Sequence, residues 1–237
     1  MVRKKTPPLT VMAVVLLGWP VALYFVKIAE RVNRMFGVWV TVLLIVILLL
    51  TVIFACLSIF IDPGRVAKNT APRLLVEDDL KDGEELEYDK NGRLVLKKIL
   101  KEDGSFECRK YCHTCQLWRP PRCSHCSFCD QCVLEFDHHC PWLSNCVGKG
   151  NYVWFVAFVT GLAVLCFAGS VVIGLLNLFE YMKDGVPLER KPWDSLILFL
   201  AVFFFLTFSL FSGFHLSLMF SGKTTAELVK QRNKSMV

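Results

Sequence analysis

The stretch from Cys112 to Cys146 reads CHTCQLWRPPRCSHCSFCDQCVLEFDHHCPWLSNC, and it holds eight of the chain's eleven cysteines. Cysteine thiolates and histidine imidazoles are the preferred ligands of zinc, and a structural zinc ion binds four of them in a tetrahedron. Two Cys-x-x-Cys pairs have the spacing of such ligands. Two sets of four can be completed from this stretch, and the candidate ligands are Cys112, Cys115, His125, Cys126, Cys129, Cys132, His139 and Cys146.

Three residues beside these ligands remain unused, namely Asp137, His138 and Cys140. A thiol with an imidazole and a carboxylate next to it is the arrangement that activates a cysteine nucleophile. The alternative is that Cys140 is one more ligand in a binding domain, but eight ligands exist without it. Cys108, His113 and Cys123 also stand outside the two sets, and we expect them to be packing or surface residues.

The composition favours a membrane protein with a reduced, metal-bound domain. The chain has 237 residues, of which 54% are hydrophobic, and its mean hydropathy is +0.46. The net charge of +6 is modest and favours contact with anionic lipid headgroups over nucleic acid. Cysteines at Cys-x-x-Cys spacing among histidines favour metal-bound thiolates in the cytosol over the disulfides of a secreted protein.

Four apolar stretches are long enough to cross a bilayer, since a helix needs about 20 apolar residues for this. They are Leu9–Ile28, Phe36–Ile61, Val153–Leu178 and Trp193–Phe220. Arg3, Lys4 and Lys5 before the first stretch resemble the start of a signal peptide. No small-residue cleavage site follows them, so we expect a retained first helix.

Four spans place both termini and the long middle segment on the same side of the membrane. That side carries 21 of the 27 Lys and Arg residues, so the positive-inside rule predicts that it is cytosolic. The sequence does not distinguish an endomembrane (ER or Golgi) from the plasma membrane. It predicts transmembrane helices in residues 1–61, a cytosolic domain in 62–152, transmembrane helices in 153–220 and a cytosolic segment in 221–237.

The middle segment is expected to be a small domain that metal ions hold together, because it is too short to bury a large core. Asn91-Gly92 between apolar residues predicts a β-hairpin, and Asp103-Gly104 predicts a second turn. We see no internal repeat in this segment. In the third span, small residues such as Gly161 and Gly169 could either leave room for a ligand or serve helix packing.

Three motifs together resemble the DHHC protein S-acyltransferases, or palmitoyltransferases. They are the cysteine-rich block with Asp137-His138-His139-Cys140, Asp62-Pro63-Gly64 after the second apolar stretch, and Thr224-Thr225-Ala226-Glu227 after the fourth. The resemblance implies an α-helical integral membrane protein with four transmembrane helices. A small cytosolic zinc-binding domain of short β-hairpins is expected between helices 2 and 3. It also implies the ligand pairing for two structural Zn²⁺: Cys112, Cys115, His125 and Cys132 in one site, and Cys126, Cys129, His139 and Cys146 in the other.

The resemblance also implies a reaction. Cys140 is expected to attack palmitoyl-CoA or another long-chain acyl-CoA, with His138 as the base and Asp137 orienting it. The acyl group is then expected to pass to a cysteine of a membrane or membrane-associated substrate protein at the cytosolic face of the bilayer. Asn151 and the Thr224–Glu227 motif are expected to support the site structurally. Arg119, Arg122 and Lys149 could meet the phosphates of CoA, although solvated surface charge is the simpler interpretation.

Two other classes of protein carry similar ligands. A membrane-anchored RING-type ubiquitin ligase would need a final Cys-Pro-x-Cys pair, but Cys140-Pro141 is followed by Trp142-Leu143. A zinc-knuckle nucleic-acid binder is opposed by the apolar spans and the modest net charge. Both alternatives predict that Cys140 never carries an acyl group.

Overall fold

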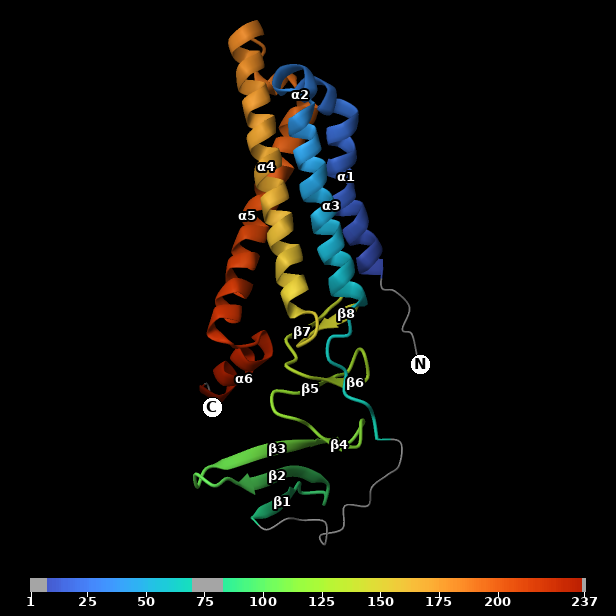
Figure 1. Ribbon diagram of the computed structural model, residues 1–237, viewed down its shortest axis with the longest axis vertical. Coiled ribbons are helices and arrows are strands. Elements are labelled where there is room, and N and C mark those ends of the chain that lie inside the picture. The colour runs from blue at the N-terminus through green and yellow to red at the C-terminus, as the bar shows by residue number, and fades with distance from the viewer. Residues whose placement is uncertain (1–7, 70–82, 236–237) are drawn as a thin grey trace. The chain divides into compact units, whose positions relative to one another are not determined.

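The computed structural model describes residues 8–69 and 83–235. Arg3, Lys4 and Lys5, which support the predicted orientation, lie outside the described residues. The chain divides into two compact units (Figure 1). The membrane unit comprises residues 1–61, 141–144 and 152–223, and the cysteine-rich unit comprises residues 62–140, 145–151 and 224–237.

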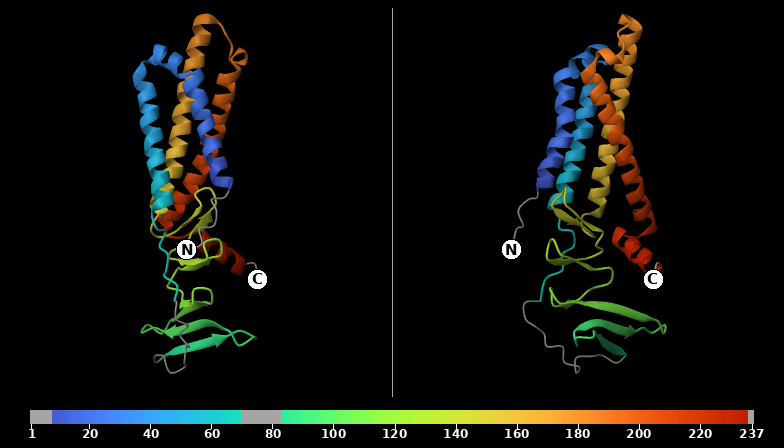
Figure 2. Two further views of the ribbon diagram at one scale, coloured as in Figure 1. Left: turned by 90° about the vertical axis from the view of Figure 1, so that its right-hand side faces the viewer. Right: turned by 180° about the vertical axis from the view of Figure 1, so that it is seen from behind.

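The membrane unit is a bundle of helices that run beside one another (Figures 1 and 2). Its helices are α1 (Pro8–Lys27), α2 (Ala29–Phe36), α3 (Val38–Phe60), α4 (Tyr152–Asp184) and α5 (Pro192–Ser221), with the 3-10 turn η2 (Leu188–Arg190) before α5. Within residues 8–69 and 83–235, the three helices α3, α4 and α5 are long and apolar enough to cross a membrane. The prediction of a helical membrane protein is confirmed for these three. The first span coincides with helix α1, and its crossing stays a prediction.

The short helix α2 is not predicted from the sequence, which carries Glu30, Arg31 and Arg34 there. Its stability comes from burial of one face: Ala29 and Val32 belong to the main apolar core of the bundle. That core also contains residues of α1, α3, α4 and α5. Gly37, at φ +86°, separates α2 from α3 in a backbone conformation that suits glycine.

An ion cluster joins three helices of the membrane unit. Arg31 on α2 donates to both oxygens of Asp194 on α5, at 2.8 and 3.0 Å. It also donates through Nε to Glu180 on α4, at 2.9 Å, and Lys191 donates to the same carboxylate at 2.7 Å. Asp194 is buried. The ion cluster therefore connects helices α2, α4 and α5 of the membrane unit.

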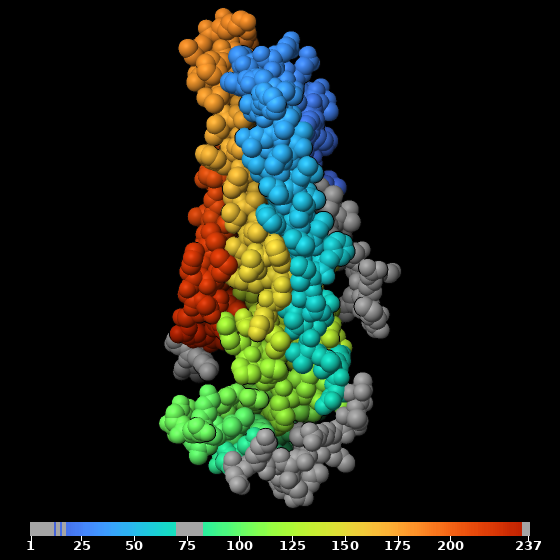
Figure 3. Space-filling model, in the orientation of Figure 1, coloured from blue at the N-terminus to red at the C-terminus, as the bar shows by residue number. Residues whose placement is uncertain are grey.

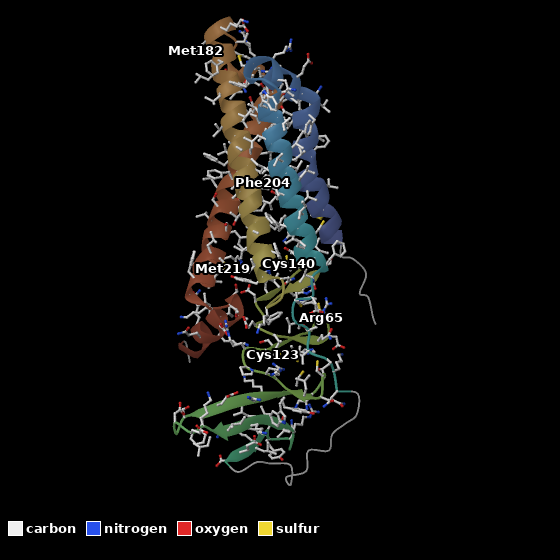
Figure 4. All side chains as sticks on the ribbon, viewed as in Figure 1. Arg65, Cys123, Cys140, Met182, Phe204 and Met219 are labelled. Atoms are coloured by element: carbon white, nitrogen blue, oxygen red, sulfur yellow. The ribbon has the colours of Figure 1, made fainter. Side chains whose placement is uncertain are left out.

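An apolar cavity of about 620 Å³ lies within the membrane unit. Its walls come from α1, α3, α4 and α5 and include Phe204 halfway along α5 (Figure 4). Gly169 on α4 contributes to the wall, whereas Gly161 serves packing, since a Cβ there would meet the Thr51 hydroxyl at 2.7 Å. Figure 3 shows α3 and α4 packed along their lengths. Trp142 and Leu143, directly after Pro141 in the chain, complete the lining.

The cysteine-rich unit is made of short antiparallel strands and one helix, α6 (Thr225–Ser235). The strands β1 (Glu84–Tyr88), β2 (Leu94–Leu100), β3 (Phe106–Cys112) and β4 (Leu117–Trp118) form one sheet in that order. Two hairpins follow, β5 (Ser124–Cys126) with β6 (Gln131–Val133) and β7 (His138–Cys140) with β8 (Asn145–Val147). The predicted β-hairpin character is confirmed, with Gly92 at φ +69° in the turn between β1 and β2.

Three successive hairpins repeat with a period of 14 residues, so the expectation of no internal repeat is wrong. Their paired residues are Cys112 with Leu117, Cys126 with Gln131 and Cys140 with Asn145. The residue before each second strand has a left-handed backbone, with φ of +52° at Gln116, +51° at Asp130 and +51° at Ser144. The three hairpins therefore share one turn geometry. Their side chains differ too much for the repeat to be obvious in the sequence.

Candidate active site and metal centres

Four side chains meet in a first cluster, formed by Cys112, Cys115, His125 and Cys132. Their ligand atoms all lie within 4.8 Å of one another. His125 Nδ1 lies 3.5 Å from Cys112 Sγ, 3.4 Å from Cys115 Sγ and 3.9 Å from Cys132 Sγ. Bonds of about 2.0 to 2.3 Å to a tetrahedral zinc ion would hold such ligands roughly 3.5 to 3.8 Å apart. The donor set and its spacing fit structural zinc.

A second cluster has the same composition, formed by Cys126, Cys129, His139 and Cys146. Cys129 Sγ lies 3.4 Å from His139 Nδ1 and 3.3 Å from Cys146 Sγ. The ring of Phe128 stacks on the His139 imidazole at 4.9 Å and fixes its plane. This cluster also fits structural zinc.

The three thiols of the second cluster influence one another's pKa. Hydrogen bonds from Cys129 and Cys146 lower the pKa of Cys126. The same contacts with Cys126 raise the pKa of Cys129 and of Cys146, because a second thiolate would be repelled by the first. Ionisation of Cys126 therefore disfavours ionisation of the other two thiols. A divalent ion would let all three ionise and bind it.

The repeat explains why Cys140 belongs to neither cluster. Each cluster takes its Cys-x-x-Cys pair from one hairpin and its histidine and third cysteine from the next. Cys140 and Leu143 occupy the pair positions of the third hairpin. Within residues 83–235, no fourth hairpin follows to supply further ligands, because the chain enters α4 at Tyr152. Cys140 is thus a buried thiol at a ligand-type position without a metal set.

The structure brings Asp137 and His138 into direct contact beside Cys140. His138 Nδ1 lies 2.8 Å from Asp137 Oδ2, and because a carboxylate only accepts, Nδ1 carries the hydrogen. Burial alone lowers the pKa of His138, but interactions with the Asp137 carboxylate and the Cys140 sulfur outweigh it and raise that pKa to about 9. The imidazolium form is therefore favoured at neutral pH.

The Thr224–Glu227 motif forms a capping box at the start of α6. The Glu227 carboxylate accepts from the Thr224 N–H at 2.9 Å, and the Glu227 N–H donates to the Thr224 hydroxyl at 3.3 Å. The next backbone N–H, that of Thr225, donates to Asp137 Oδ1 at 2.7 Å. Burial raises the pKa of Asp137, but the hydrogen bonds from His138 and from the Thr225 N–H outweigh it and lower that pKa. His138 and the N-terminus of α6 thus together favour the ionised form of Asp137.

Arg122 links the helix to the hairpins. Its guanidinium donates to both oxygens of Glu227, at 2.7 and 3.1 Å. Arg122 has φ +59°, a conformation that costs a residue other than glycine about 1 kcal/mol or more. Arg122 is an exposed residue, as expected of a surface charge, and its guanidinium binds the capping box.

The segment after α3 supports the third hairpin. Asp62 accepts from the backbone N–H groups of Gly64 and Arg65, both at 2.7 Å. Arg65 then donates to the Asn145 side chain at 2.8 Å, directly across the strands from Cys140. Gly150 packs so closely that a Cβ there would lie 2.1 Å from the Asp62 carbonyl oxygen. The Asp62-Pro63-Gly64 motif therefore positions Arg65 against the third hairpin and packs against Gly150.

Asn151 closes the same hairpin from its other end. It is fully buried, its side chain donates to the Cys146 carbonyl at 2.9 Å and accepts from the Gly148 N–H at 3.0 Å. Sequence reasoning missed Arg65 and Asn145. Their only sequence signal is their position beside the Asp62-Pro63-Gly64 motif and in the third copy of the repeat.

The leftover residues do not join either cluster. Cys108 and His113 are exposed, and His113 meets the edge of Tyr111. Cys123 is buried beside the first cluster. Lys149 lies 3.5 Å from Glu135, with its side chain mostly exposed.

Comparison with known proteins agrees with this geometry. The family model of the DHHC palmitoyltransferases matches residues 105–232, which is more than half of the chain. Palmitoyltransferase ZDHHC5-B of Danio rerio is 36% identical over 185 residues, which cover 78% of this chain and 26% of that protein. Protein S-acyltransferase 8 of Arabidopsis thaliana is 32% identical over 243 residues, which cover 95% of this chain and 57% of that protein.

A third relative, palmitoyltransferase ZDHHC8 of Mus musculus, is 36% identical over 173 residues, covering 73% of this chain and 21% of that protein. The chain thus spans between about a fifth and somewhat more than half of the length of these relatives. The match of the family model includes both metal clusters, Cys140 and the capping box of α6. The chain therefore belongs to the DHHC palmitoyltransferase family.

Proposed function

We propose that this protein is a protein S-palmitoyltransferase that works through an acyl group on Cys140. The observation that carries the proposal is a buried thiol, left out of two complete metal-binding sets, beside a histidine that a carboxylate holds at 2.8 Å. Neither metal set requires this thiol as a ligand. A base oriented by a carboxylate beside a thiol is the arrangement that activates a cysteine nucleophile.

In the first step, the Cys140 sulfur attacks the carbonyl carbon of the acyl-CoA thioester. A new carbon–sulfur bond forms, and CoA leaves as its thiol with a proton supplied by the His138 imidazolium. In the second step, neutral His138 takes the proton from a cysteine thiol of the substrate protein. That thiolate attacks the acyl-enzyme thioester, and Cys140 leaves with its negative charge beside the reformed imidazolium.

Asp137 acts through His138 in both steps. Its carboxylate fixes the tautomer and the ring orientation, and it stabilises the imidazolium that each cycle requires. The Thr225 N–H satisfies the other carboxylate oxygen. Asp137 is therefore a positioning residue, whose removal should leave the metal content unchanged.

The two clusters would each hold a structural zinc ion through three thiolates and one imidazole. When bound, zinc supplies the cross-links that fold the hairpins, because structural zinc sites contribute folding energy directly. His139 would anchor one strand while its neighbour His138 serves the reaction.

The apolar cavity supports a long-chain acyl group as the substrate. Its volume of about 620 Å³ falls within the roughly 300–1,000 Å³ of ligand pockets, and its walls are almost entirely apolar. Exposing an acyl chain to water costs roughly 0.8 kcal/mol per CH₂, or on the order of 12 kcal/mol for a palmitoyl chain. Trp142 and Leu143 tie this wall to Cys140 by two and three residues of chain.

The membrane setting supports protein cysteines close to the bilayer as acceptors. Cys140 is only twelve residues before the first residue of α4, so the chain tethers the thiol to a membrane helix. We place both termini and the cysteine-rich unit in the cytosol, where the thiols stay reduced. The name of the relative protein S-acyltransferase 8 agrees with a protein acceptor.

A two-stage assay tests the proposal. Purified protein is first incubated with palmitoyl-CoA, freed of excess CoA ester, and then mixed with a cysteine-containing peptide anchored to vesicles. We expect the acyl group to appear on the protein, to be removed by hydroxylamine, and to move to the peptide. If the protein keeps its zinc and its fold but never acquires an acyl group, it is an interaction module and not an acyltransferase.

A further inference from the structure

Cys123 is a buried thiol that neither the metal sets nor the proposed reaction uses. Cys123 is labelled in Figure 4. Only 7% of its surface is exposed, and it packs with Cys112, Cys115 and Cys132 around the first cluster. It lies outside the group whose ligand atoms are all within 4.8 Å of one another. The first cluster therefore has five candidate donors for four positions, whereas the second has no counterpart of Cys123 among its buried neighbours in the described part of the chain.

A tight turn delivers Cys123 to this place. The Cys123 N–H donates to the Pro120 carbonyl at 3.1 Å, and Arg122 in the third position of the turn has φ +59°. A proline in the second position and a positive φ in the third are the features of a type II turn. The third position of such a turn favours glycine, and the contact with Glu227 holds Arg122 there instead. This contact and the Cys123–Pro120 hydrogen bond together fix the turn.

The strand β5, which begins directly after Cys123, carries His125 in its middle. Neighbouring residues of a strand face opposite sides, and residues two apart share a side. Ser124 meets Lys230 at 2.8 Å and Cys126 joins the second cluster, whereas His125 joins the first. Cys123 stands two residues before His125 and packs against the same three thiols.

A positive charge is available for one more thiolate. Arg119 Nε is buried and has no hydrogen-bond partner in the described part of the chain. Arg119 directly precedes Pro120, where the turn that ends at Cys123 begins. Four thiolates on a divalent ion carry one negative charge more than three thiolates and a neutral imidazole. Arg119 would offset that charge.

We propose that Cys123 is a reserve ligand of the first metal cluster. When His125 leaves the zinc ion, the metal–nitrogen bond breaks and a bond to Cys123 Sγ forms. The thiol proton passes to the freed imidazole, so no outside reactant is needed. Zinc allows this exchange because it accepts either donor and has no geometric preference from its d electrons. The first site thereby keeps four ligands.

Cobalt substitution counts the ligands directly, using the full chain purified in detergent. The variants are His125→Ala, Cys123→Ala and the double variant, with Cys108→Ala as the control for loss of an exposed thiol. We expect His125→Ala to bind two Co²⁺ ions, with stronger thiolate-to-metal charge-transfer absorption than the unsubstituted protein. The double variant should bind one. Cys123→Ala and Cys108→Ala should each bind two, with the unsubstituted spectrum.

Two outcomes overturn the proposal in this experiment. His125→Ala protein that binds one ion, like the double variant, would mean that Cys123 cannot reach the metal. Cys123→Ala protein that binds one ion would mean that Cys123 is a primary ligand.

A second measurement avoids any loss of fold, because it leaves all eight ligands in place. Transfer of zinc to a competing chelator is followed in the unsubstituted protein, Cys123→Ala and Cys108→Ala. We expect one of the two ions to leave Cys123→Ala about tenfold faster, the lower end of the effect of removing an outer partner of a metal site. Equal rates in the three proteins would refute the proposal, whether or not the protein transfers acyl groups.

Discussion

The contact between the Thr225 N–H and Asp137 can be removed alone, by Thr225→Pro. Proline lacks the N–H, and it is well tolerated at the first position of a helix, where its φ already suits the helix. Thr224 is the cap, and cap residues typically have the extended backbone that a residue before proline prefers. The capping box between Thr224 and Glu227 therefore stays in place.

The expected effect follows from the burial of Asp137. The lost hydrogen bond of 2.7 Å goes to an ionised carboxylate of which only 2% is exposed. Hydrogen bonds to charged groups contribute about 1.5–3 kcal/mol. We expect the free energy of unfolding of the cysteine-rich unit to fall by about that amount, and autoacylation to slow about tenfold for each 1.4 kcal/mol lost from the orientation of His138.

The assay compares thermal unfolding and the rate of acylation by palmitoyl-CoA in Thr225→Pro and Thr225→Ala. Alanine keeps the N–H and removes a hydroxyl that forms no hydrogen bond of good geometry in the described part of the chain and influences Asp137 less than the N–H does. It should therefore behave almost like the unsubstituted protein, with both zinc ions retained in all three. If the proline and alanine variants unfold at the same temperature and react at the same rate, the contact with Asp137 has no role.

Three further perturbations separate the parts of the structure. His138→Ala should keep two zinc ions and slow autoacylation by about 10²-fold or more, whereas His139→Ala should lose one zinc ion. Metal analysis of both variants checks this. Loss of zinc from His138→Ala but not from His139→Ala would contradict the assigned roles. Arg31→Met should destabilise the membrane unit by about 3 kcal/mol, because it leaves buried Asp194 without its cation. Thermal unfolding measures this beside Arg34→Met, the control for loss of an exposed arginine. Equal unfolding temperatures of the two variants would refute the prediction. Gly150→Ala should fold poorly, since its Cβ would lie 2.1 Å from the Asp62 carbonyl oxygen, whereas Gly174→Ala meets nothing within 4 Å; equal yields of the two would contradict the packing.

Residue chemistry alone identified the cysteine and histidine donors, because few other roles require so many soft ligands in so short a stretch. Their pairing came from the resemblance. The 14-residue period could have provided it, since Cys112, Cys126 and Cys140 stand at equal intervals, as do His125 and His139. The period is hard to see because the third copy replaces the second cysteine by Leu143.

The elements that sequence reasoning missed depend on distant contacts. Helix α2 is stable because Val32 packs with residues of α4 such as Ile173 and Leu176, which are far away in the chain. The contact of Thr225 with Asp137 joins residues 88 positions apart. No local pattern predicts such contacts, so the capping box could be identified as a motif but not as a partner of Asp137.

The central claim is that Cys140 is a nucleophile outside both metal sets. The most direct test is the intact mass and the zinc content of one purified sample, for the unsubstituted protein and Cys140→Ser, after incubation with palmitoyl-CoA. We expect two zinc ions in both proteins and one hydroxylamine-labile acyl group on the unsubstituted protein alone, because a serine hydroxyl is far less acidic than a thiol. A Cys140→Ser protein with one zinc ion, or with the same labile acyl group, would contradict the account.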